Sequence, residues 1–90
     1  MYGNNILHIP CENGNIKLVK SLIECSCNKE IKDNYGRTPV FCAASCGHLA
    51  VVQYLISVGA NKDAKSNDGS TPLSISWGIV SDYLKSIGAK

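Results

Sequence analysis

Apolar residues recur at helical spacing through much of the chain. In the middle of the sequence they are separated by three, four and seven positions, at Leu49, Val52, Leu55 and Ile56. That spacing places them on one side of an α-helix. A shorter run of the same kind covers 39–46, and Gly47 lies between the two runs, where glycine commonly ends a helix. The pattern therefore predicts two short helices in succession, about 39–46 and 49–57.

Polar turn-forming residues precede the first of these helices. The segment Asp33-Asn34-Tyr35-Gly36 predicts a turn, because Asp and Asn side chains bond nearby backbone groups and Gly36 tolerates a positive φ. The hydroxyl of Thr38 can accept a free N–H at the start of the next helix, and Pro39 suits a first helical position that needs no donor. The segment is thus predicted to fold as turn, helix, glycine, helix.

This unit returns after about 33 residues, and an internal repeat of such a period indicates a stacked architecture. The turn and helix-start residues Asn34, Gly36, Thr38 and Pro39 fall on Asn67, Gly69, Thr71 and Pro72. Beyond that point the third copy is shortened, and Val51, Tyr54 and Leu55 then match Val80, Tyr83 and Leu84.

Helices this short are marginal alone, so the copies are expected to stack and share one core. We expect a single all-α domain, 1–90, with three parts. These are a degenerate repeat at about 1–32, a repeat at about 33–65 and a shortened C-terminal cap repeat at about 66–90.

The middle unit resembles an ankyrin repeat. The resemblance rests on Gly36, Thr38-Pro39-Val40, Ala43-Ala44, Gly47-His48, Val51-Val52 and Gly59-Ala60, and the register extends it over essentially the whole chain. It implies an ankyrin-type helix-turn-helix solenoid with β-hairpin-like finger loops. It also implies a partner protein bound on the concave side by finger tips and first helices. The positions concerned are Lys32, Asn34, Tyr35, Arg37, Ser45, Cys46, Lys65, Asn67, Asp68 and Ser70.

The first repeat departs from the family pattern at two places. Pro10 stands where the family has Ala, and a proline inside a regular helix costs ~3 kcal/mol. We therefore expect a first helix that is kinked, or one that begins late enough to place Pro10 in its first turn. His8 occupies the family's His place without the preceding Thr, whereas Phe41 and Ser74 stand at that place in the later copies.

The last repeat departs through its lost residues around 76–78. Its first helix must be short, and polar residues on its outer face are what a terminal repeat needs, here Ser81, Asp82, Lys85 and Lys90. We interpret Trp77, at the shortened corner, as a lid over the end of the core, with a partner contact as the alternative.

Charge and apolar runs indicate which partners to expect. Nine basic and seven acidic residues are scattered along the chain and give a net charge of +2, without a basic block or stripe. We therefore expect no nucleic-acid or membrane partner. The first residues show no secretory signal, and no apolar run approaches the length of a membrane span. The expected compartment is the cytosol, with the nucleus as the alternative.

Five cysteines without a secretory signal indicate reduced thiols rather than a disulfide framework. Cys11, Cys25 and Cys27 fall at positions where the repeat favours small apolar side chains, so we interpret them as such residues. Cys46 is expected on the exposed side of its helix and is the candidate reactive thiol. A metal or redox site built on the pairs Cys25-x-Cys27 and Cys42-x-x-x-Cys46 stays open as an alternative.

No pattern in the sequence indicates catalysis. Neither His8 nor His48 belongs to a motif with a nucleophile. Four acidic residues lie in polar turns, where a capping or solvated role is expected: Glu30, Asp33, Asp63 and Asp68. The glycines match no phosphate-binding motif. We expect no enzymatic activity, no cofactor or metal and no small-molecule substrate. The sequence thus favours a module that binds another protein. The alternatives are a remnant or piece of a longer array without independent function, and the thiol-based site.

Overall fold

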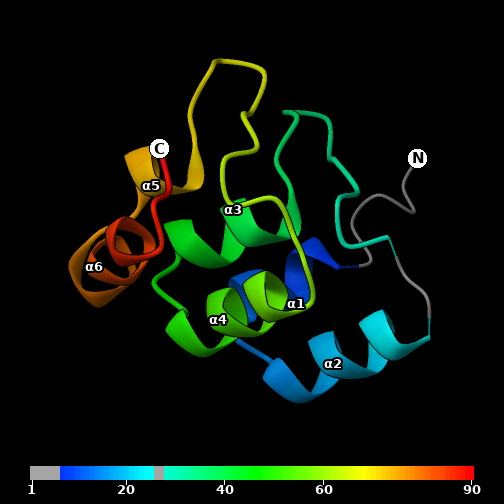
Figure 1. Cartoon of the computed structure of the whole chain (residues 1–90). Helices are drawn as coiled ribbons and strands as arrows, with labels where there is room; N and C mark the ends of the chain where they lie inside the picture. The colour runs from blue at the N-terminus through cyan, green and yellow to red at the C-terminus, as the bar shows by residue number, and fades with distance from the viewer. Residues whose placement is uncertain (1–6, 26–27) are drawn as a thin grey trace.

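The computed structural model describes residues 7–25 and 28–90 (Figure 1). Over this part of the chain the regular elements are all helices, as the all-α prediction requires. They are α1 (His8–Asn13), α2 (Ile16–Glu24), α3 (Pro39–Ser45), α4 (Leu49–Ser57), α5 (Pro72–Ile75) and α6 (Gly78–Ser86).

The pair α3–α4 shows how local signals set the helix bounds. The Thr38 hydroxyl accepts the backbone N–H of Phe41 at 3.4 Å, and Pro39 occupies the first helical position. Gly47 takes φ 78° between the helices, in the left-handed region that other residues avoid. The predicted helix 49–57 is confirmed, and α3 ends one residue earlier than predicted.

The helix pairs stack in two rows. The first helices α1, α3 and α5 pack against one another in chain order, and α2, α4 and α6 form the second row (Figure 1). Both rows contribute to one buried cluster, so the expectation of a shared core is confirmed. Its residues include Leu7, Cys11, Val19, Val40, Ala43, Ala44, Val51, Val52, Leu55, Val80 and Leu84.

Two loops project from the first-helix row, and their tips are the fingers of the structure. We call residues 33–37 finger 2 and residues 66–70 finger 3. Each is closed by one backbone bond, from Asp33 N–H to Arg37 O at 3.1 Å and from Ser66 N–H to Ser70 O at 2.9 Å. The equal bonding shows that the register of the repeat holds in three dimensions.

Asn67 joins the two fingers. Its backbone N–H donates to Tyr35 O at 2.8 Å, and its side-chain amide donates to Asn34 O at 3.1 Å. A Cβ at Gly36, where φ is 76°, would lie 2.8 Å from the Asn67 backbone nitrogen. Glycine therefore allows the fingers to approach closely enough to bond.

Pro10 lies in the first turn of α1, as one of the two expectations required. The helix begins at His8, so Pro10 is its third residue, and the first helical bond runs from Cys11 N–H to Leu7 O at 3.2 Å. The N–H that proline lacks would have had no partner in the helix. The segment before Leu7, which includes the family's Thr place at Asn5, lies outside the described residues.

The third repeat has the short first helix that its lost residues predicted, since helix α5 has only four residues. Asp82, Lys85 and Lys90 are exposed and Ser81 is half-buried, but Ile79 of α6 is 65% exposed, so the predicted polar face is only partly present.

The interpretation of Trp77 as a lid over the core is wrong. Its side chain is 61% exposed, and its indole N–H donates to Ser45 O at 3.3 Å in the preceding repeat. The shortening of the third repeat moves Trp77 to the start of α6, beside Gly47, rather than over the end of the buried cluster.

Candidate functional site

A hollow of about 300 Å³ lies between the two fingers, on the side of the first helices. Its lining comes from both fingers, from α3 and from α5. The lining residues are Tyr35, Arg37, Phe41, Ser66, Asn67, Asp68, Ser70 and Ile75. Five of the predicted binding residues therefore meet at one place: Tyr35, Arg37, Asn67, Asp68 and Ser70.

The hollow combines apolar surface with polar finger residues. Phe41 is buried and Ile75 half-buried, so both offer carbon surface to an entering group. The Tyr35 side chain is 68% exposed at the tip of finger 2, and the Arg37 guanidinium lies 5.2 Å from its ring centre. Such a mixture of apolar surface and a few polar groups is typical of recognition sites.

Arg37 holds finger 2 against the first repeat. Its Nε donates to Asp33 Oδ2 at 2.7 Å, and its Nη2 lies 2.6 Å from the same oxygen in an ion pair. Nη2 also lies 3.9 Å from Glu12 Oε2 in α1. Burial alone would raise the pKa of Asp33. Hydrogen bonds from the Arg37 side chain and from the backbone N–H groups of Arg37 and Tyr35 outweigh it and bring that pKa below its ordinary value of 3.8. Arg37 is thus largely committed to the fold.

Asp68 is the exposed carboxylate of finger 3. Its Oδ1 accepts the Ser66 hydroxyl and, at 3.0 Å, the backbone N–H of Ser70. These bonds, the Ser66 hydroxyl first, hold the pKa of Asp68 below 3.8, so the group is ionised at neutral pH. The hollow therefore has a negative charge at its edge.

The other predicted binding residues lie elsewhere. Lys32 and Lys65 line a separate, polar hollow of about 610 Å³ that also includes Glu30 and Asp63. Cys46 is exposed at the end of α3, and the hydroxyl of neighbouring Ser45 donates to the carbonyl of Cys42 at 3.0 Å. Ser45 and Cys46 line neither hollow.

Three residues of the hollow between the fingers were missing from the sequence prediction: Phe41, Ser66 and Ile75. Phe41 carried a signal, because it stands at the position where the family has His. Ser66 occupies the register position of Asp33, and neither residue was among the predicted binding residues.

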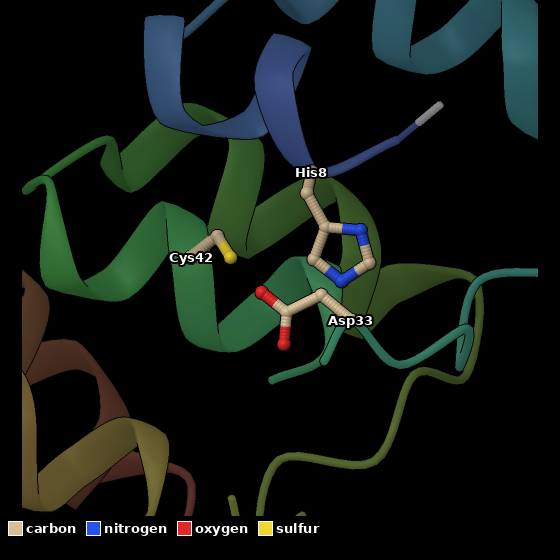
Figure 2. Close-up of side chains that lie close together, drawn as sticks. All are labelled: His8, Asp33 and Cys42. Atoms are coloured by element: carbon tan, nitrogen blue, oxygen red, sulfur yellow. The ribbon is translucent and has the colours of Figure 1, made fainter. Parts of the chain in front are cut away.

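His8, Asp33 and Cys42 converge from α1, finger 2 and α3 (Figure 2). A candidate ligand atom of each lies within 4.8 Å of the other two. The His8 Nε2 bonds Arg37 O at 2.6 Å, so Nε2 carries the proton. The buried Nδ1 has no hydrogen-bond partner among the described residues.

The chemistry of this group does not suit a metal ion. Asp33 is already paired with Arg37, and burial raises the pKa of the Cys42 thiol to about 12. A cation would have to displace the guanidinium and a tightly held proton. We interpret the group as a hydrogen-bonded joint between the first and second repeats.

The cysteines divide between core and surface. Cys11 and Cys42 are buried, whereas Cys25 and Cys46 are exposed. Cys11 therefore serves as a small apolar residue of the core. Cys25 is exposed, as is Val58 at its register position, and Cys27 lies outside the described residues. Cys42 and Cys46 have different surroundings, one in the core and one in solvent, so they do not form the proposed ligand pair.

His48 has a structural role. Its Nε2 bonds the carbonyl of Glu12 at 2.8 Å, which joins the second repeat to α1.

Within the part of the chain that the structure describes, no helix is both long and apolar enough to cross a membrane.

The comparisons with known proteins agree with this architecture. Among curated proteins, none is significantly similar to the chain. The family model for ankyrin repeats in three copies matches residues 2–66, which is more than half of the sequence. The match includes repeats one and two and the first residue of finger 3. The chain therefore belongs to the ankyrin repeat family.

Proposed function

We propose that this chain is a non-catalytic module that binds a partner protein at the hollow between fingers 2 and 3. Ankyrin repeats are generally protein-interaction modules and are typically not enzymes. The hollow has the size and the mixed lining of a site for one partner side chain. Exposed Tyr35 at its edge is of a residue type that often dominates binding energy.

The single observation that carries this proposal is the convergence of both fingers on one hollow. Tyr35 comes from finger 2 and Asp68 from finger 3, and Phe41 forms apolar surface between them. A partner side chain entering there would touch two repeats at once. Such a contact would bury more surface than a flat patch on one helix.

The histidines support the non-catalytic part of the proposal. His8 and His48 each bond a backbone carbonyl of another segment through Nε2. Both rings therefore join repeats, and among residues 7–25 and 28–90 neither is placed as a base beside an exposed nucleophile.

A pull-down with the intact chain as bait tests the function. We expect Tyr35→Ala to lower capture of the main partner at least tenfold, because the variant removes the exposed aromatic contact. Gln53→Ala is the matched control, since Gln53 is exposed on α4, in the other row of helices. Both variants should keep the helical circular dichroism of the parent. Equal capture by Tyr35→Ala and parent would contradict the proposal.

A further inference from the structure

The hollow has a filled counterpart one repeat earlier. Moving back by one repeat, Phe41, Ser66, Ser70 and Ile75 of its lining fall on His8, Asp33, Arg37 and Cys42. His8, Asp33 and Cys42 lie together at the joint of the first two repeats (Figure 2). Arg37 is bonded to two of them, through its side chain to Asp33 and through its carbonyl to His8. Ser70 stands in the place of Arg37, and its side chain is too short to occupy the same space.

Finger 3 also has a carboxylate, although it comes from a different position of the repeat: Ser66 stands at the place of Asp33, and Asp68 follows two residues later. In finger 2, Asp33 Oδ1 accepts the Arg37 backbone N–H at 2.9 Å. In finger 3, Asp68 Oδ1 accepts the corresponding Ser70 N–H at 3.0 Å. A carboxylate is therefore held beside the same backbone position in both fingers. In finger 2, Arg37 of the same finger is the cation that pairs with the Asp33 carboxylate. Asp68 has no ion pair among the described residues.

Charge around the hollow also favours a cation. Arg37 is the basic residue of its lining, and Asp33 and Glu12 both pair with it. With Asp68, the group holds one positive and three negative charges. An entering acidic side chain would meet this excess of negative charge, whereas a basic one would be attracted.

We propose that the hollow between the fingers receives an arginine side chain of the partner protein, with its guanidinium paired to Asp68. The methylene stem would lie on Phe41 and Ile75, as long basic side chains commonly cover apolar surface. Arginine fits better than lysine because its planar fork can present two donors to a carboxylate, whereas lysine offers a point charge. This inference rests on the proposed function and names the chemistry of the partner as a basic segment.

Two neutral-capped amino acids test the inference directly. N-acetylarginine methylamide carries the cation, and N-acetylcitrulline methylamide is its uncharged isostere. Each is titrated into ¹⁵N-labelled chain at low salt. We expect the arginine probe to shift the amide signals of Tyr35, Asp68 and Ser70, with an affinity about fivefold above that of citrulline, as an exposed ion pair allows.

Two variants give the result its specificity. Ser70→Arg should fill the hollow from within, as Arg37 does in finger 2, and abolish the shifts. Asp68→Asn should remove the preference for arginine over citrulline without filling the hollow. Ser57→Arg adds the same charge at an exposed position of α4 and should leave probe binding unchanged.

The inference is overturned if the two probes bind equally, if neither binds, or if the arginine shifts survive in both Ser70→Arg and Asp68→Asn. Asp68→Asn keeps the test decisive should Ser70→Arg fail to fold. The outcomes also separate the two proposals. Partner capture that depends on Tyr35 but not on Asp68 removes the arginine assignment alone. If variants at Tyr35, Asp68 and Ser70 all capture the partner as well as the parent does, the hollow is not the binding site and the proposed function is contradicted.

Discussion

The indole of Trp77 occupies in the third repeat the place that the imidazole of His48 occupies in the second. His48 precedes α4 and bonds Glu12 O at 2.8 Å, while Trp77 precedes α6 and bonds Ser45 O at 3.3 Å. The two carbonyls are one repeat apart in the sequence. Each ring also lies over a glycine with positive φ in the preceding repeat, His48 over Gly14 and Trp77 over Gly47. A ring N–H thus joins each repeat to the previous one, even where the third is shortened.

The contact between Trp77 and Gly47 predicts an unequal cost for two glycine substitutions. A Cβ at Gly47 would lie 2.7 Å from the indole, whereas a Cβ at Gly69 would meet nothing within 4 Å. Both glycines have positive φ, so each change to Ala costs about 1 kcal/mol of backbone strain. We expect Gly47→Ala to lower the free energy of unfolding by about 1–3 kcal/mol more than Gly69→Ala does, measured by urea denaturation.

A double-mutant cycle checks that the extra cost comes from the indole. In a Trp77→Ala background the ring is absent, and Gly47→Ala should then cost about as much as Gly69→Ala. An extra cost that persists without the ring would show that the contact described here is not its source.

Pro10 should cost the fold little. It lies at the third position of α1, where an N–H would have no helical partner. We therefore expect Pro10→Ala to change the free energy of unfolding by less than about 1 kcal/mol. The matched control is Ala43→Pro, at the same register position but inside α3, where the lost bond and steric clash should cost about 3 kcal/mol or more. Similar effects for the two variants in thermal unfolding would contradict the placement of Pro10.

The pairing of Asp33 predicts a loss of stability in acid. The pKa of Asp33 in the folded chain lies below its ordinary value of 3.8, so protonation favours the unfolded state. Ionised Asp33 stabilises the fold fully at pH values above its ordinary pKa. This stabilisation fades as the pH falls through the pKa that Asp33 has in the folded chain. Asp33→Asn should therefore destabilise the chain by about 1–2 kcal/mol at pH 7 and by progressively less as the pH falls below about 4.

Urea titrations at several pH values measure this effect. Asp82→Asn, at an exposed position of α6, serves as the control and should change stability little at any of them. A difference between Asp33→Asn and parent that stays constant from neutral pH down to strong acid would contradict the ion pair.

The thiols should react in two classes. Cys25 and Cys46 are exposed, while Cys11 and Cys42 are buried, and burial raises the pKa of each buried thiol to about 12. Labelling at about pH 7.5 followed by peptide mass spectrometry should modify the exposed pair quickly. The buried pair should react only at the rate of unfolding and should become as reactive as the others in denaturant. Fast labelling of Cys42 in the native chain would contradict the packing of α1 against α3.

Much of the fold follows from signals within a few residues. Thr38, Pro39 and Gly47 set the bounds of α3, and apolar spacing set those of α4, because caps and helical faces depend on neighbours in sequence. The short helix of the last repeat followed from its missing residues. The sequence left open whether Pro10 kinks its helix or begins it, since the choice depends on how α1 packs against α3.

The lining of the hollow was predicted less completely. The register of the repeat located both fingers, so Tyr35, Asn67, Asp68 and Ser70 could be predicted to lie near one another. The register could not show that Arg37 is held by Asp33 and the first repeat, or that Phe41 and Ile75 form the apolar part of the hollow.

The sequence by itself determined the repeat, its period and the bounds of its central helices, because those features depend on local turns, helix caps and the spacing of apolar residues. Only the tertiary structure decided which side chains join repeats and which face the hollow. Those roles depend on partners about one repeat away, such as His48 with Glu12 and Trp77 with Ser45. The stacking distance between copies, rather than any local preference, decides whether such side chains meet.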